Sequence, residues 1–203
     1  MLDAWKTDNQ ELLGAAAGAA KRAVLLVCIR QYSLVNVELR RFIECILWYT
    51  YFADHPVEWE VFRANPAGSW EKKTQKPIET AASAPINYYL RYLEERMGSE
   101  PSGLAKAAVG VFRTEYGKVS RYIHGATPAM DGSLALAHDR EDPRQHFELK
   151  TRCYKIFKSG CILVAALKVK LLEELSATDR RYFDRLVSPS TARKIREQPF
   201  GIQ

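Results

Sequence analysis

The segment Glu115-Tyr-Gly-Lys-Val-Ser-Arg-Tyr-Ile-His-Gly125 closes a long helical pattern and carries polar side chains at a regular spacing. Tyr116, Ser120 and His124 are four residues apart, and four residues advance about 40° around an α-helix. The three side chains therefore form one slanted stripe. A phenol, a hydroxyl and an imidazole all exchange hydrogen bonds, so the stripe is either a site or a buried polar seam.

Apolar residues recur at helical spacing along most of the chain, and no run alternates with period two for long enough to indicate a strand. Ser33 and Asn36 are both possible helix caps, so the chain around them either breaks or continues as one long helix. The pattern predicts an all-α bundle of about six or seven helices with no significant sheet. The expected helices span residues 9–31, 37–53, 57–64, 83–97, 103–124, 142–175 and 178–187, with one or two further turns over 191–198.

The chain divides into a helical bundle domain over residues 1–176 and a basic helix and tail over 177–203, packed on the bundle or extending from it. Tyr182 and Phe183 lie in the second part, where they could stack on bases. The segment is either a phosphate-binding surface or a solvated helix face. Its basic residues are Arg180, Arg181, Arg185, Arg193, Lys194 and Arg196.

Thirty Lys and Arg residues against 24 Asp and Glu give a formal net charge of +6. An acidic partner follows from this balance, RNA or DNA ahead of an anionic membrane surface. The charges are spread along the sequence, however, so a mildly basic protein without such a partner is the alternative. The longest apolar runs fall short of the ~20 residues that span a bilayer, and the N-terminal residues are polar. We expect a cytoplasmic protein with no membrane association.

The four cysteines lie inside apolar helical runs and form no Cys-x-x-Cys pair, so we expect neither a metal site nor a cofactor. The chain also lacks a glycine-rich phosphate loop, a nucleophile elbow and a His-Glu-x-x-His motif. Most common enzyme classes are therefore disfavoured. The cysteines are Cys28, Cys45, Cys153 and Cys161.

The segment Glu38-Leu-Arg-Arg-Phe-Ile-Glu-Cys45 places Arg40 and Glu44 one helical turn apart within an apolar stretch. If this face points inward, the pair needs further partners and could meet the stripe; if it points outward, the pair contributes little. The surrounding aromatic residues favour burial. The candidate polar cluster comprises Tyr116, Ser120, Arg121, His124, Arg40 and Glu44, with His124 as a general acid or base or as a phosphate contact. The alternative is a purely structural seam.

The segment Arg140-Glu-Asp-Pro-Arg-Gln-His146 separates an arginine and a histidine by five residues. This spacing resembles the Arg-x(4–6)-His signature of HEPN-family ribonucleases. In that family the Arg and His of two protomers face each other and cleave RNA by polarising the 2′-hydroxyl and stabilising the phosphorane. Here Glu141 replaces the small polar residue that the family prefers, and Pro143 interrupts the spacing. Arg140 and His146 form a second candidate catalytic pair.

More broadly, the segment 38–48 followed by Tyr-x-x-x-Ser-x-x-x-His-Gly resembles bacterial helical proteins described as HEPN-like, some encoded near phage-defence and abortive-infection genes. The resemblance covers about residues 30–170 and implies a helical fold and a defence setting. Our first hypothesis is a nucleic-acid-associated protein of a bacterial defence or toxin-type system, acting as a binding module or subunit. The alternatives are a metal-independent HEPN-like ribonuclease and a protein-interaction scaffold, with a protein partner or a homodimer in either case.

Overall fold

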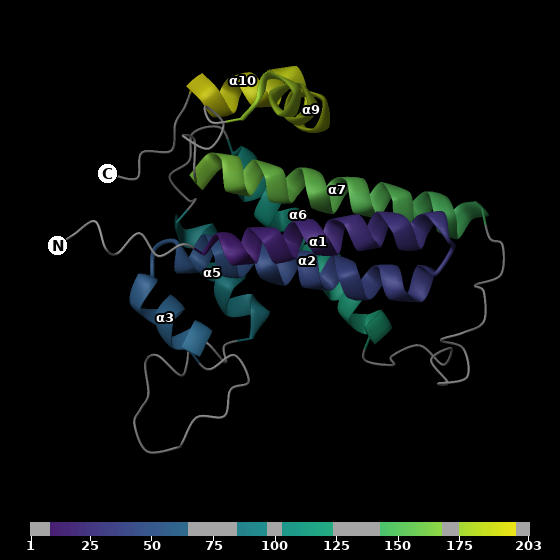
Figure 1. The fold of residues 1–203 in the computed structure, drawn as a ribbon, viewed down its shortest axis with the longest axis horizontal. Helices are drawn as coiled ribbons and strands as arrows, with labels where there is room; N and C mark the ends of the chain where they lie inside the picture. The colour runs from purple at the N-terminus through teal and green to yellow at the C-terminus, as the bar shows by residue number, and fades with distance from the viewer. Residues whose placement is uncertain (1–8, 65–84, 97–102, 124–142, 168–174, 198–203) are drawn as a thin grey trace, which may run out of the picture.

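A computed structural model of the chain describes residues 9–64, 85–96, 103–123, 143–167 and 175–197. Helices account for 91% of these residues, and none of them lies in a strand. The all-α prediction is confirmed, with eight helices in the described part where six or seven were expected. They are α1 (Gln10–Cys28), α2 (Tyr32–Phe52), α3 (Pro56–Ala64), α5 (Ile86–Arg96), α6 (Leu104–Ile123), α7 (Pro143–Leu167), α9 (Ala177–Val187) and α10 (Pro189–Glu197) (Figure 1).

The helix is interrupted between α1 and α2, where Arg30 adopts the left-handed conformation with φ 59°. Two backbone hydrogen bonds close the end of α1, from Arg30 N to Val27 O (3.2 Å) and from Gln31 N to Leu26 O (2.8 Å). α2 then begins at Tyr32, five residues before the expected start at 37. Ser33 and Asn36 therefore lie within the helix, and the expectation that either one caps it is wrong.

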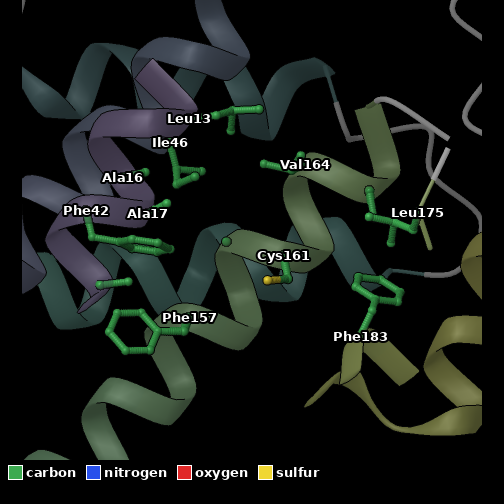
Figure 2. Close-up of a pocket in the computed structure, with 13 residues that line it drawn as sticks. Leu13, Ala16, Ala17, Phe42, Ile46, Phe157, Cys161, Val164, Leu175 and Phe183 are labelled. Carbon is green, nitrogen blue, oxygen red and sulfur yellow. The ribbon is translucent and has the colours of Figure 1, made fainter. Parts of the chain in front are cut away.

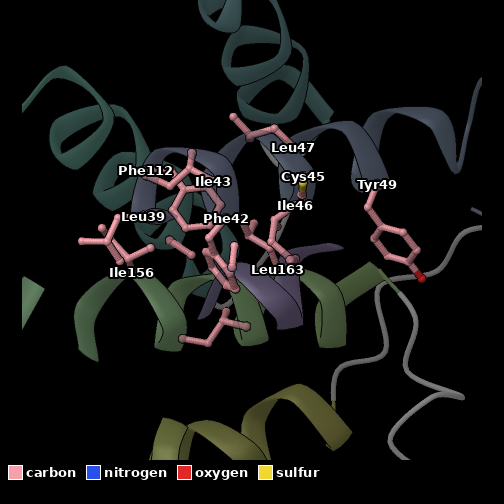
Figure 3. Packing of buried hydrophobic residues seen from close by; sticks show 14 of the residues in the cluster. Leu39, Phe42, Ile43, Cys45, Ile46, Leu47, Tyr49, Phe112, Ile156 and Leu163 are labelled. Carbon is pink, nitrogen blue, oxygen red and sulfur yellow. The ribbon is translucent and has the colours of Figure 1, made fainter. Parts of the chain in front are cut away.

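α2 is the central helix of the bundle, packed against α1, α6, α7 and α5. Its buried side chains point in all directions around the helix axis, as expected for a helix enclosed on most sides. Figure 3 shows Leu39, Phe42 and Ile43 of α2 among Phe112 of α6 and Ile156 of α7. One continuous core therefore joins these three helices.

α7 approaches α2 closely at Gly160. A Cβ atom at this position would lie 2.7 Å from Phe42 Cζ, well inside van der Waals contact. The Phe42 ring is itself held by edge contacts, with its centroid 5.0 Å from that of Phe157 and 6.5 Å from that of Phe112. The absence of a side chain at Gly160 is thus what allows the two helices to pack at this distance.

An aromatic cluster joins the C-terminal end of α2 to α3 and α5. The Tyr51 ring stacks on His55 at 4.0 Å, and its hydroxyl donates to Glu58 Oε2 (2.8 Å). Burial, together with hydrogen bonds to Tyr88 and Glu58, raises the pKa of Tyr51 above its usual range. The phenol therefore stays neutral and serves as a structural hydrogen-bond donor.

The C-terminal helices α9 and α10 pack against each other and against α7. Val187, Ala192 and Ile195 are their buried residues. α9 begins at Ala177 rather than 178, because the Ser176 side chain accepts a hydrogen bond from Asp179 N (3.1 Å) and caps the helix. Among the described helices, none has both the length and the apolar character needed to cross a bilayer.

We predict that Gly160→Ala lowers the free energy of unfolding by about 1–3 kcal/mol, because the new methyl group overpacks against the fixed Phe42 ring. Gly110→Ala is the matched control in α6, since its added Cβ would meet nothing within 4 Å. It should raise stability by up to about 1 kcal/mol through helix propensity. Urea denaturation followed by circular dichroism measures both; equal effects would contradict the proposed close approach.

Candidate functional site

Three members of the candidate polar cluster, Arg40, Glu44 and Tyr116, meet at the α2–α6 contact. Arg40 Nε donates to Glu44 Oε1 (2.8 Å), and the Tyr116 hydroxyl donates to the same oxygen (2.9 Å). The Arg40 guanidinium lies 5.5 Å from the centroid of the Tyr116 ring. One carboxylate therefore joins a cation on its own helix to a phenol 72 residues away in sequence.

The surroundings of this cluster keep Tyr116 neutral and Arg40 charged. Burial, then the charge and hydrogen bond of Glu44, raises the pKa of Tyr116. Burial lowers the pKa of Arg40, but the hydrogen bond and charge of Glu44 outweigh it, so the pKa of Arg40 is raised overall. Neither group is poised to exchange a proton near neutral pH.

The other members of the candidate polar cluster are Ser120, Arg121 and His124. The Ser120 Oγ is buried and forms no hydrogen bond of ordinary geometry with the described residues. It lies close enough to Tyr116 to offset a small part of the rise in the pKa of that phenol. Arg121 is exposed and donates to Gly117 O in its own helix (3.2 Å), so it does not join the cluster. His124 lies outside the described residues.

The second candidate pair is half described, because Arg140 lies outside the described residues. His146, in the first turn of α7, shares a 3.0 Å hydrogen bond between its Nδ1 and the Tyr32 hydroxyl. The two rings also meet edge to face at 5.9 Å. This histidine therefore ties the start of α7 to the start of α2.

A buried ion pair between α6 and α7 was missed in the sequence. Glu115 is 5% exposed, and its Oε2 lies 3.1 Å from Arg152 Nε. Lys118 Nζ bonds to the other oxygen at 2.8 Å, and Arg152 also donates to Asn36 Oδ1 (3.1 Å). Arg152 interrupts the apolar face formed by Leu149, Cys153 and Ile156, which is the signal that could have revealed it.

This ion pair lies at the wall of a polar pocket of about 340 Å³ between α6 and α7. Phe147 stands at the pocket with 69% of its surface exposed. The pocket brings three cations and two carboxylates together beside an aromatic ring. Its lining residues are Glu115, Lys118, Phe147, Glu148, Thr151, Arg152 and Lys155.

All six basic residues predicted at the C-terminus are exposed on α9 and α10. Two of them are neutralised, since Arg196 pairs with Asp184 and Arg193 with Glu197. Arg185 and Lys194 face no carboxylate among the described residues. The helix pair therefore presents cations outward while its apolar side rests on α7.

The exposed aromatic residues occur in the same region. Across the described chain, the large exposed aromatic side chains are Phe147 and Tyr154 on α7 and Tyr182 on α9. The Tyr154 hydroxyl donates to Leu186 O of α9 (3.0 Å), which ties the two helices together. Sequence reasoning selected Tyr182 but missed both aromatic residues of α7.

The chain's excess of positive charge lies in the last three helices of the described part. Together α7, α9 and α10 contain eleven of the chain's 30 Lys and Arg residues but only four of its 24 Asp and Glu. This excess of seven is larger than the net charge of +6 for the whole chain. The positive character of the protein therefore belongs to these three neighbouring helices.

A second, apolar cavity of about 410 Å³ lies between α1, α2, α7 and α9 (Figure 2). Ala16 and Ala17 line it from α1, Cys161 from α7 and Phe183 from α9. Burial raises the pKa of the Cys161 thiol to about 11, so this thiol stays protonated and unreactive at neutral pH. The described residues contain no group of three or more His, Cys, Asp or Glu able to hold a metal ion.

No protein-family model, curated protein or solved structure matches this chain.

We predict that Arg152→Met lowers the free energy of unfolding by about 3 kcal/mol or more, because it leaves the Glu115 carboxylate buried without its main counter-charge. Adding Glu115→Gln to this variant should restore part of the loss. Lys155→Met, at an exposed position on the same helix, should stay within about 0.5 kcal/mol of wild type. Urea denaturation measures the free energy of unfolding of each variant. If Arg152→Met is as stable as the Lys155→Met control, the proposed pairing of Glu115 with Arg152 is contradicted.

Proposed function

We propose that this protein binds single-stranded nucleic acid through α7, α9 and α10. The observation that carries the proposal is the coincidence of two features on these helices. They hold the chain's excess positive charge, and they hold Phe147, Tyr154 and Tyr182, the large exposed aromatic residues of the described part. Cations that contact phosphates and aromatic rings that stack on bases are together the usual surface of a single-strand binder.

The cations of these helices suit a phosphate backbone because several of them form no ion pair with the described residues of the protein. Arg185 and Lys194 have no carboxylate beside them in the described chain, and Arg181 donates only to Ala177 O of its own helix (3.3 Å). A carboxylate partner would compete with phosphate for these side chains. Each cation that replaces a condensed counterion contributes to affinity and makes that affinity depend on salt.

The aromatic residues favour a single strand over a duplex. Tyr182 is 65% exposed and Phe147 is 69% exposed, so each presents a ring to solvent. Stacking on such a ring requires a base face that is not covered by its neighbours, and single strands offer such faces. Each stacked base adds about 1–3 kcal/mol in proteins of this kind.

The resemblance to HEPN-like bacterial proteins suggests the biological setting. On this ground we propose that the protein belongs to a defence or toxin-type system, where it would act on RNA or DNA as a binding module or subunit. The cluster of Arg40, Glu44 and Tyr116 is then a structural seam, because Arg40 and Tyr116 both bond to Glu44 and the raised pKa of each keeps its proton in place.

We predict that Arg181→Ala combined with Arg185→Ala weakens binding to a single-stranded 12-mer about tenfold or more at 100 mM salt. The slope of log affinity against log salt should fall by about 1.4, since each lost contact to a single strand removes about 0.7. Fluorescence anisotropy over a salt series measures both quantities.

The control variant is Arg63→Ala combined with Arg91→Ala, which removes the same charge from α3 and α5. Both side chains are more than half exposed, at 55% and 71%. This control should change affinity less than threefold. Equal losses in the two double variants would mean that net charge alone drives binding, and no binding by the wild type would refute the proposal.

The ribonuclease alternative has one observation in its favour. The Ser120 hydroxyl is buried without a good hydrogen bond beside Tyr116, at the end of α6 that leads toward His124. We predict for this alternative that the protein cleaves single-stranded RNA in EDTA, and that His124→Ala or His146→Ala abolishes cleavage while the protein stays folded. If the protein binds RNA without cleaving it, and His124→Ala binds with unchanged affinity, the binding module is favoured.

A further inference from the structure

We infer that the polar pocket between α6 and α7 holds one unstacked base of the bound strand, with guanine preferred over the other bases. This inference rests on the proposed function, because the strand must first lie along α7. It adds a sequence preference that phosphate contacts and stacking alone do not provide.

The pocket has the size and walls that a base requires. Its volume of about 340 Å³ lies in the range of small-ligand sites, roughly 300–1,000 Å³. Phe147 offers an exposed ring at one wall, while Lys118 and Lys155 stand at the others. A base removed from its stack is commonly held by such a combination of an aromatic face and polar groups directed at its edge.

Glu115 is the group that can read the base. Its carboxylate is buried and already paired, with Lys118 on Oε1 and Arg152 near Oε2. Nevertheless, the buried Oε2 accepts no hydrogen bond of normal geometry from the described residues. A carboxylate has about four acceptor positions, so this oxygen can take a further N–H donor without losing its charge partner. It exposes almost no surface in the free protein, so an entering base must displace the side chains that cover it.

Guanine matches this arrangement better than the other bases. Its Watson–Crick edge carries two adjacent donors, N1–H and the N2 amino group, and the major-groove edge that begins beside N1 carries two acceptors, O6 and N7. The donors suit Glu115, and the acceptors suit the ammonium groups of Lys118 and Lys155. Adenine and cytosine offer only their amino group as a donor, and uracil only N3–H between two carbonyl oxygens.

The test measures the wild-type protein by fluorescence anisotropy with three RNA 12-mers. They are all uridine, uridine with one central guanosine, and uridine with one central 1-methylguanosine, in which the N1 donor is blocked. We expect the guanosine strand to bind about tenfold tighter than the all-uridine strand, and the methylated strand to lose most of that advantage. Because only the RNA changes, the folding of the protein is not at issue.

Two protein variants complete the test. Phe147→Ala, at an exposed position, should reduce the guanosine advantage to less than threefold, whereas Tyr182→Ala should weaken all three strands alike. Glu115→Gln should abolish the advantage in the fraction that circular dichroism shows to be folded. If the wild type binds all three strands equally, the guanine pocket is refuted while the nucleic-acid function stands. If it binds none of them, both proposals fail.

Discussion

Charged and polar side chains at the α2–α6–α7 contact must find partners, because leaving them unpaired in the interior would cost several kcal/mol each. Glu44 accepts hydrogen bonds from Arg40 and Tyr116, while Arg152 forms an ion pair with Glu115 and donates to Asn36. Apolar contacts tolerate small rotations of a helix, but these directional bonds do not. The two sets therefore fix how α6 and α7 are rotated and shifted against α2.

That rotation decides what the protein presents to solvent. With Leu149, Ile156 and Gly160 turned toward α2, the opposite side of α7 must carry Phe147 and Tyr154 outward. α9 and α10 then pack on α7 and add their own cations beside these rings. The same interior pairing thus determines both the core and the basic, aromatic surface.

Helix positions could be predicted from the sequence because periodicity depends on local spacing alone. The partial burial of Arg40 and Glu44 could also be anticipated, since aromatic residues surround them in the chain. The pairing of Glu115 with Arg152 could not, because the rotation of two helices about their own axes brings those residues together. From the sequence alone, Glu115 and Arg152 could equally be two separate charges in solvent, and only the packing of α6 against α7 shows that they form a pair.

The position of the excess positive charge in space could not be predicted for the same reason. The excess of Lys and Arg over residues 143–197 can be counted in the sequence. That α9 and α10 pack on α7, so that the three helices present their cations together, depends on the fold. Arg140, which with His146 carries the resemblance to the HEPN ribonuclease signature, lies outside the described residues, as does His124, and the roles of both stay predictions.

The contact between α9 and the bundle is less completely filled than the core. Phe183 closes one side of an apolar cavity of about 410 Å³, and water gains nothing there because the walls offer almost no hydrogen bonds. Val187 and the bond from Tyr154 to Leu186 O add to the contact of α9 with the bundle. If a nucleic-acid strand binds across α7 and α9 as proposed, any ordering of α9 that binding requires would lower the affinity that the exposed cations and rings alone would give.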